Sequence, residues 1–151
     1  GKLALKDGRT IWWMLTDFYG EYNENIFRSV VQANPHIKNL SRVQAGELIH
    51  LPALPVEKSP LAANRYWVRI AASKNLEETY EFYRTYKLEA PSLRFLPYWN
   101  PRQGMVFSIM LKNGFPDETA ARRSITRLPD ALATEAGVLT NLEKDTVFYT
   151  R

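Results

Sequence analysis

The chain of 151 residues contains no cysteine and only two histidines, His36 and His50. The lack of cysteine excludes disulfides, thiolate nucleophiles and cysteine-ligated zinc sites. No HExxH-like spacing, Ser/His/Asp constellation, P-loop or dinucleotide fingerprint is present. The glutamates Glu77, Glu78 and Glu81 stand at the start of an expected helix, where they suit the helix dipole better than a glycosidase acid pair. We therefore expect that the protein is not an enzyme and that it binds neither a metal ion nor another cofactor.

Long apolar runs and long charge runs are also missing. No apolar stretch approaches the ~20 residues that a membrane-spanning helix needs. The chain starts with Gly instead of Met and shows no signal peptide, so we expect a soluble piece of a larger protein. Apolar residues make up 45% of the sequence, which is enough for a packed core, and the net charge is +4. This mild excess suits nucleic acid, an anionic polymer or neither.

A proline-containing stretch, PALPVEKSPLAAN (Pro52–Asn64), divides the chain. It has three prolines and no helical periodicity, and structureless loops of this length are uncommon inside compact domains. We expect one domain over residues 1–53, a linker over residues 54–64 and a second domain over residues 65–151.

The first domain is expected to have the order β-α-α-β. LAL (Leu3–Leu5) predicts a strand, and IWWMLTDFY predicts a helix that Thr10 caps and Gly20 ends. A second helix follows, capped by Asn23 or Asn25 and ended before Pro35. ELIHLP predicts the last strand, paired antiparallel with the first.

These elements resemble the LysM domain. DGRTIW, FYG, NPHI and AGELIHLP stand in the order and at the spacing of that family, over residues 2–52, with Arg9 and Ala45 as departures. The resemblance implies binding of N-acetylglucosamine-containing polymers such as peptidoglycan or chitin, in a shallow groove between two turns. The implied groove residues are Asp7, Gly8, Arg9, Thr10 and Ile11 in the first turn, and Asn34, Pro35, His36 and Ile37 in the second. His36 is then a loop residue that touches sugar or solvent.

The second domain is expected to have the order β-α-β-β-α-β. RYWVRIAA, SLRFLPYW, MVFSIML and GVLTNL predict four strands, and the helices lie in NLEETYEFYRTYKLEA and PDETAARRSITRLPDAL. TVFY is a further short extended piece. The fold class is therefore α+β, and the second domain should form a four-stranded antiparallel sheet of ferredoxin-like order, with both helices on one face and the other face open.

The second domain resembles the SPOR domain over residues 65–148, through YWVRIAASKNLEETYEFY and GFPDETAARRSITRLP. The resemblance implies binding of peptidoglycan glycan chains. We place Trp67, Arg69, Tyr98 and Trp99 on the open sheet face, although the facing of Tyr98 and Trp99 beside Pro97 stays open. Arg69 and Ala72 stand where that family commonly has Gln and Ser. In the third strand, either Ser108 and Met110 or Phe107 and Ile109 face outward.

The expected function is non-catalytic binding of peptidoglycan glycan strands by two tethered modules, which localise a larger envelope protein in the periplasm or cell envelope of a bacterium. Membrane anchoring would come only from segments outside this chain. One alternative is a protein-protein interaction module of a division or secretion complex. A third reading is RNA binding by an RNA-recognition sheet, which RQGMVFSI imitates loosely, with Met105 where an aromatic residue would stack a base.

Overall fold

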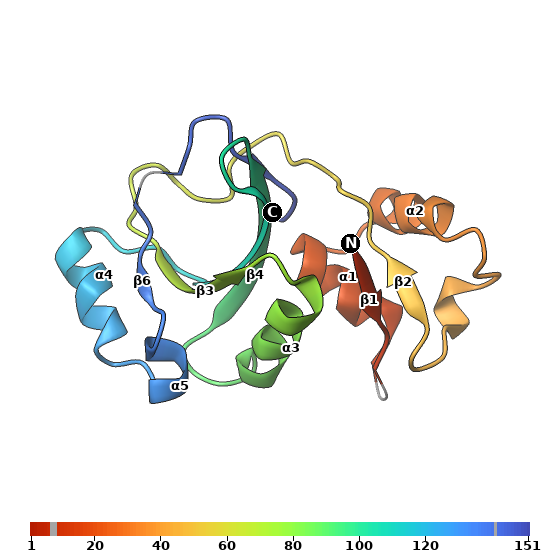
Figure 1. Cartoon of the computed structure of the whole chain (residues 1–151), viewed down its shortest axis with the longest axis horizontal. Coiled ribbons are helices and arrows are strands. Elements are labelled where there is room, and N and C mark those ends of the chain that lie inside the picture. Colours follow the sequence, from red (N-terminus) through yellow and green to blue (C-terminus); the bar gives the residue numbers. More distant parts are fainter. Residues whose placement is uncertain (7–8, 141) are drawn as a thin grey trace.

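The computed structural model describes residues 1–6, 9–140 and 142–151. It confirms the α+β class, with one two-stranded sheet, one five-stranded sheet and helices packed against them (Figure 1). Asp7 and Gly8, two of the expected groove residues, lie outside the described residues. In the described ranges no helix combines the length and the apolar content that crossing a membrane requires.

The first half of the chain forms the smaller sheet and two helices. Strand β1 (Lys2–Ala4) pairs antiparallel with β2 (Leu48–His50). Between them lie α1 (Ile11–Tyr19), α2 (Glu24–Ala33) and the 3-10 turn η1 (Leu40–Arg42). The expected helix ends are confirmed: the Thr10 hydroxyl accepts from the Trp13 N–H, Asn23 caps α2, and Gly20 takes a left-handed φ of 77°.

The larger sheet has the strand order β6-β3-β5-β4-β7, and its neighbouring strands pair antiparallel. The order along the chain is β3 (Val68–Ser73), α3 (Leu76–Tyr86), β4 (Leu93–Asn100), β5 (Gly104–Leu111), α4 (Glu118–Ile125), α5 (Asp130–Ala133), β6 (Gly137–Val138) and β7 (Val147–Phe148). The prediction of four strands is wrong, because the TVFY stretch adds a fifth strand along β4, with Phe148 opposite Tyr98. The second expected helix is also interrupted before Asp130, since Pro129 lacks an N–H donor and restricts the residue before it.

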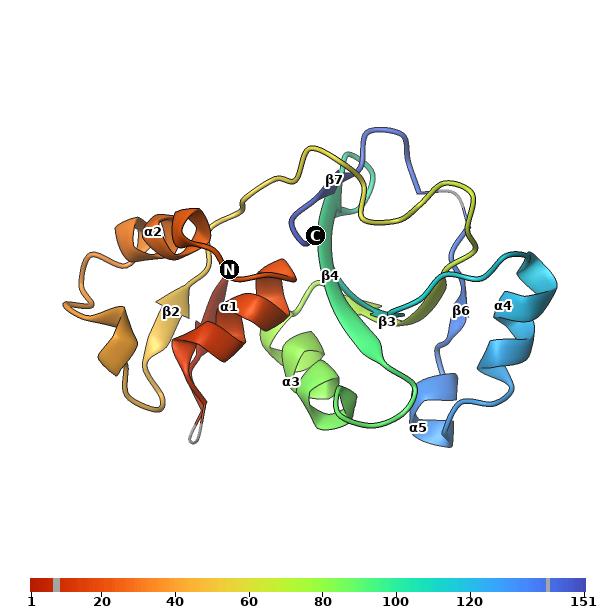
Figure 2. The same ribbon diagram turned by 180° about the vertical axis from the view of Figure 1, so that it is seen from behind.

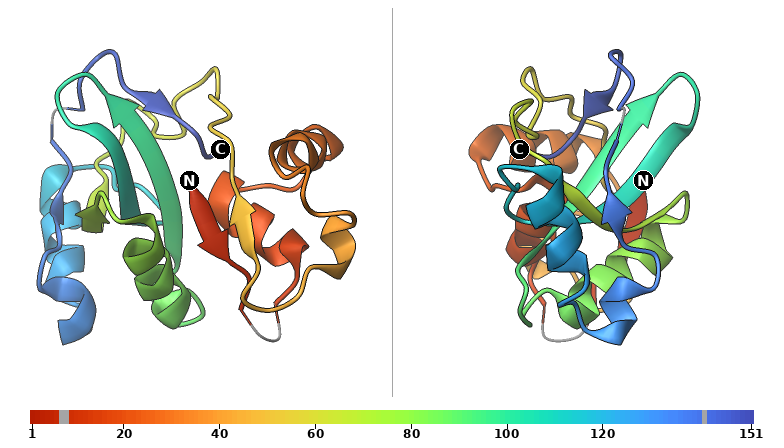
Figure 3. Two further views of the ribbon diagram at one scale, coloured as in Figure 1. Left: turned by 45° about the vertical axis from the view of Figure 1, so that its right-hand side comes forward. Right: turned by 90° about the vertical axis from the view of Figure 1, so that its left-hand side faces the viewer.

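One face of the larger sheet carries the main core. Phe95 of β4 is 1% exposed, and its ring centroid lies 5.7 Å from those of Tyr80 and Tyr83 on α3. Helix α1 of the first half packs on the same face, beside β4 (Figures 2 and 3). The ring centroids of Phe18 and Phe95 lie 5.8 Å apart there. Residues from both halves of the chain therefore share one hydrophobic core.

The other face of this sheet is covered, so the expectation of an open face is wrong. Tyr98 and Met110 on that face are 2% and 1% exposed, and they pack in a second cluster with Leu61 and Phe148. Chain from the expected linker and chain after β6 supply this cover. The physical reason is that the face is apolar at Leu96, Tyr98, Val106 and Met110, and both segments bring apolar side chains to it.

The C-terminal residues fasten the two halves to each other. The Thr150 hydroxyl donates to the Phe18 carbonyl at 2.7 Å, and the Arg151 N–H donates to the Tyr19 carbonyl at 3.2 Å. A Cβ placed on Gly20 would collide with the Arg151 carbonyl oxygen. The end of α1 is thus held by backbone that is distant in sequence.

Candidate functional site

The expected groove residues of the first turn differ in their access to solvent. Thr10 is exposed, but its hydroxyl already accepts the Trp13 N–H at the start of α1. Arg9 is half-buried. Ile11 is 7% exposed and belongs to the main core, so it packs inward and does not present its side chain to a ligand.

Asn34 in the second turn is fully buried, and its side chain is fully used inside the protein. Its amide nitrogen donates to the carbonyls of Val30 (2.7 Å) and His50 (2.8 Å), and its amide oxygen accepts the His50 N–H (2.7 Å). Asn34 thereby joins the end of α2 to strand β2. This side chain has a structural role and is not available to a sugar.

The exposed part of the second turn borders a cavity of about 610 Å³. His36 and Ile37 line it, and neither Arg9, Thr10 nor Ile11 does. The remaining lining residues are mostly polar and come from η1 and the loops on either side of it: Lys38, Asn39, Arg42, Gln44, Ala45 and Glu47. Sequence reasoning missed these residues, although the run of polar residues after Ile37 was a signal for them.

The four expected sheet residues do not share one face. Trp67, Arg69 and Tyr98 lie on the covered face, together with Ser108 and Met110. Trp99 lies on the other face of the sheet, where its cross-strand partner is Met105 of β5, and the residue is 40% exposed. The alternation along β4 separates it from Tyr98.

The side chain of Trp67 makes contacts within the protein. Its indole N–H donates to the Ala62 carbonyl at 3.2 Å, and its ring is half-buried against the cluster around Leu61. Tyr98 is likewise buried, with its ring centroid 6.1 Å from that of Phe148. The expectation of an open Tyr98 ring is therefore wrong, and Trp67 is only partly accessible, because the covering segments pack on both rings.

A cavity of about 320 Å³ remains on this face, at the end of the sheet where β4 turns into β5. It brings together Arg69 and Tyr98 with Asn100, Arg102 and Gln103. The wall opposite is formed by Leu139, Thr140, Leu142 and Glu143. The two expected residues Arg69 and Tyr98 thus do line a common site.

The polar groups of this cavity are held in place by the turn between β4 and β5. The Gln103 N–H donates to the Asn100 side-chain oxygen at 2.7 Å, and the Asn100 amide donates to the Gln103 side-chain oxygen at 3.0 Å. In the part of the chain that the structure describes, Arg69 and Arg102 form no ion pair. Two guanidinium groups and one carboxylate, that of Glu143, therefore border the cavity, and the excess of positive charge favours an anionic or strongly polar ligand.

Exposed aromatic rings on α1 are a feature that the sequence reading missed. Trp12 is 45% exposed, with its ring centroid 5.2 Å from that of Trp13 and 6.3 Å from that of Tyr22. The inner stripe of Ile11, Leu15 and Phe18 already implied that Trp12 and Trp13 lie off the core face.

Comparison with models of protein families, with curated proteins and with solved structures found no significant match to this chain. Among the described residues, no three His, Asp or Glu side chains gather in a group that could hold a metal ion.

Proposed function

We propose that this chain binds peptidoglycan glycan strands of the bacterial cell wall without cleaving them. In this proposal residues 1–53 are a LysM-like module and residues 65–151 are a SPOR-like module with an added edge strand, β7. The chain would act in the periplasm or cell envelope, as part of a larger protein that it localises.

The observation that carries the proposal is the cavity of Arg69, Tyr98, Asn100, Arg102 and Gln103. Peptidoglycan strands offer hydroxyls, acetamido groups and lactyl carboxylates. Guanidinium groups pair with carboxylates in two-point geometry, and amide side chains pair with hydroxyl and acetamido groups. Leu139 and Leu142 in the opposite wall add apolar surface beside these polar groups.

The cavity beside His36 supports a second contact of the same kind. It is polar, shallow and bordered by the apolar side chain of Ile37, which could pack on an acetamido methyl group. The two cavities are carried by halves that share one core, so their spacing is set by packing and not by a free linker. Two weak contacts held at a fixed spacing can raise avidity by ~10²–10⁴ when both reach one polymer.

The test is co-sedimentation of the purified chain with isolated sacculi, followed by titration with three ligands: glycan strands stripped of stem peptides, chitooligosaccharide and single-stranded RNA. We expect co-sedimentation and saturable binding of at least one glycan. Binding of RNA alone would favour the RNA-binding alternative. Binding of none of the ligands would contradict the proposal and favour a protein-protein interaction module.

A further inference from the structure

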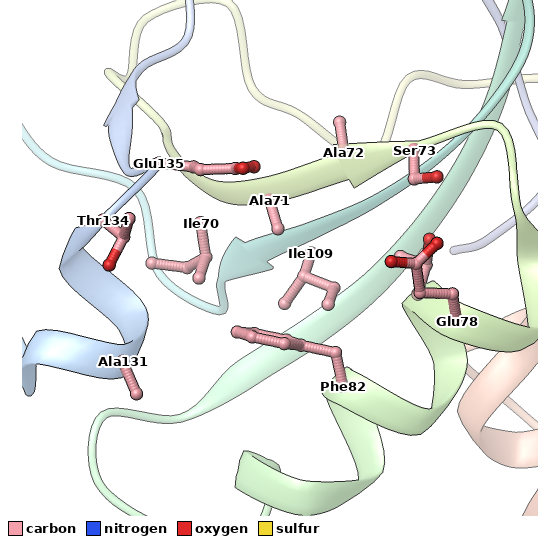
Figure 4. Close-up of a pocket in the computed structure, with 11 residues that line it drawn as sticks. Ile70, Ala71, Ala72, Ser73, Glu78, Phe82, Ile109, Ala131, Thr134 and Glu135 are labelled. Carbon is pink, nitrogen blue, oxygen red and sulfur yellow. The ribbon is translucent and has the colours of Figure 1, made fainter.

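A groove of about 520 Å³ lies between α3 and α5 on the helix-bearing face of the larger sheet (Figure 4). Its floor consists of Ile70 and Ala71 of β3 and Ile109 of β5, and Phe82 of α3 forms one wall. This volume falls in the ~300–1,000 Å³ range of sites that accept ligand groups. The groove is separate from both cavities assigned to glycan.

Two exposed glutamates border the groove. Figure 4 shows Glu78 of α3 and Glu135, just after α5, on opposite sides of the cavity. Neither forms an ion pair within the described part of the chain. This local negative charge contrasts with the net charge of +4 of the whole chain.

Two of the three hydroxyl groups around the groove already donate their hydrogen inside the protein, whereas the third, Ser73, acts there as an acceptor. The Thr79 hydroxyl already donates to the Asn75 carbonyl at 2.7 Å, and the Thr134 hydroxyl donates to the Asp130 carbonyl at 3.0 Å. The Ser73 hydroxyl oxygen accepts the Asn75 N–H at 3.0 Å. The two carboxylates therefore favour a ligand that supplies hydrogen-bond donors with positive charge, carried on an apolar stem that covers the floor.

Within the described part of the chain, the sheet edge beside the groove has no strand partner. Strand β6 pairs only with Val68 and Arg69, and the chain before it turns away into α5. Ala71–Ser73 therefore have β5 on one side and, among the described residues, no strand on the other. Such an edge accepts an extended peptide through main-chain hydrogen bonds.

We propose that this groove docks an extended segment of a partner protein that adds to the β3 edge and inserts lysine or arginine side chains between Glu78 and Glu135. A lysine or arginine stem is apolar and its head is cationic, so one side chain satisfies both the apolar floor and the acidic border. The proposal does not depend on glycan binding.

The probe is a short acetylated peptide of alternating lysine and threonine, titrated against the full chain with amide NMR as the readout. We expect shifts at Ala71–Ser73 and around Phe82, and weaker binding at higher salt. The Glu78→Gln/Glu135→Gln variant should lower affinity at least about tenfold. The matched control Glu77→Gln/Glu89→Gln removes the same charge from α3 and its end, outside the groove, and should change affinity less than about twofold.

Two further peptides separate the parts of the proposal. A peptide with glutamate in place of lysine should not bind, and a peptide with N-methyl groups on alternate residues should bind at least about tenfold more weakly, because it cannot pair with the sheet edge. A dissociation constant of the lysine peptide above about 1 mM, equal binding of the glutamate peptide, or shifts confined to other surfaces would each overturn the proposal. Since no glycan is used and Arg69 and Arg102 stay intact, these results are independent of the proposed function.

Discussion

The ammonium group of Lys87, at the end of α3, lies 2.7 Å and 2.6 Å from the two carboxylate oxygens of Asp17 on α1. The two side chains are only 6% and 10% exposed. The Tyr80 hydroxyl donates to the same carboxylate at 3.1 Å, and the Lys87 ammonium lies 5.4 Å from the Trp13 ring centroid. A buried, hydrogen-bonded ion pair therefore joins the two halves of the chain.

Removing the cation of this pair should destabilise the protein strongly. Lys87→Met leaves the Asp17 carboxylate buried without its cation, and we expect the free energy of unfolding in urea to fall by about 3–5 kcal/mol. The control is Arg28→Met in the exposed pair with Glu24, which should cost at most about 0.5 kcal/mol. The double variant Asp17→Leu/Lys87→Met should be more stable than Lys87→Met alone. A single variant as stable as the wild type would contradict a buried role for the pair.

Stability should fall as the pH rises above about 10. Burial, followed by the negative charge of Asp17 and the hydrogen bond to it, raises the pKa of the Tyr80 hydroxyl; burial also raises the pKa of Tyr19 and Tyr83. Above the ordinary tyrosine pKa the unfolded chain loses protons that the folded chain keeps, so each such tyrosine lowers stability by up to about 1.4 kcal/mol per pH unit.

Urea unfolding at a series of alkaline pH values measures this slope. Tyr80→Phe should be less stable than the wild type at neutral pH, because Asp17 loses a hydrogen bond, but its stability should decrease less steeply with pH. Identical slopes for the two proteins would show that Tyr80 is not protected in the folded state.

Asn34 and His36 should separate folding from binding in the first half of the chain. Asn34→Ala removes three side-chain hydrogen bonds, one buried and two partly buried, and takes away the partner of both backbone groups of His50, so we expect a loss of about 2–4 kcal/mol in unfolding free energy. The exposed Asn25→Ala should be near neutral. His36→Ala should keep the stability and lower the affinity for chitooligosaccharide. Normal stability of Asn34→Ala would refute its structural role.

Arg69 and Arg102 provide the direct test of the cavity on the larger sheet. Arg69→Gln/Arg102→Gln should weaken sacculus binding at least about tenfold with little change in stability, because neither group forms an ion pair among the described residues. Arg28→Gln/Arg122→Gln removes the same charge from exposed helix surfaces and controls for general electrostatic attraction. Equal loss in both double variants would indicate non-specific attraction to an anionic polymer.

Local signals in the sequence predicted most elements of the fold correctly. Capping residues and turn glycines act on the nearest backbone groups, so Thr10, Asn23 and Gly20 could be placed from their neighbours alone. The fifth strand could not be predicted in the same way. Its partner is β4, about fifty residues earlier in the chain, and nothing in the TVFY text specifies that pairing.

The candidate sites were predicted only in part for a related reason. Periodicity placed Trp67, Arg69 and Val68 on their correct sides of β3, but it carried no information about which distant segment covers a face. The cover comes from residues such as Leu61 and Phe148, whose local sequence is typical of loops and short extended pieces. Arg102, Gln103 and the residues after β6 join the site only through that tertiary packing.

The packing of Phe18 against Phe95 has a practical consequence for anyone who wishes to study the halves separately. Cutting the gene at the proline-rich stretch would strip α1 of its aromatic neighbours and bare the centre of the larger sheet. Each half expressed alone should then tend to precipitate. Co-expressed halves should instead associate and bury these apolar surfaces against each other.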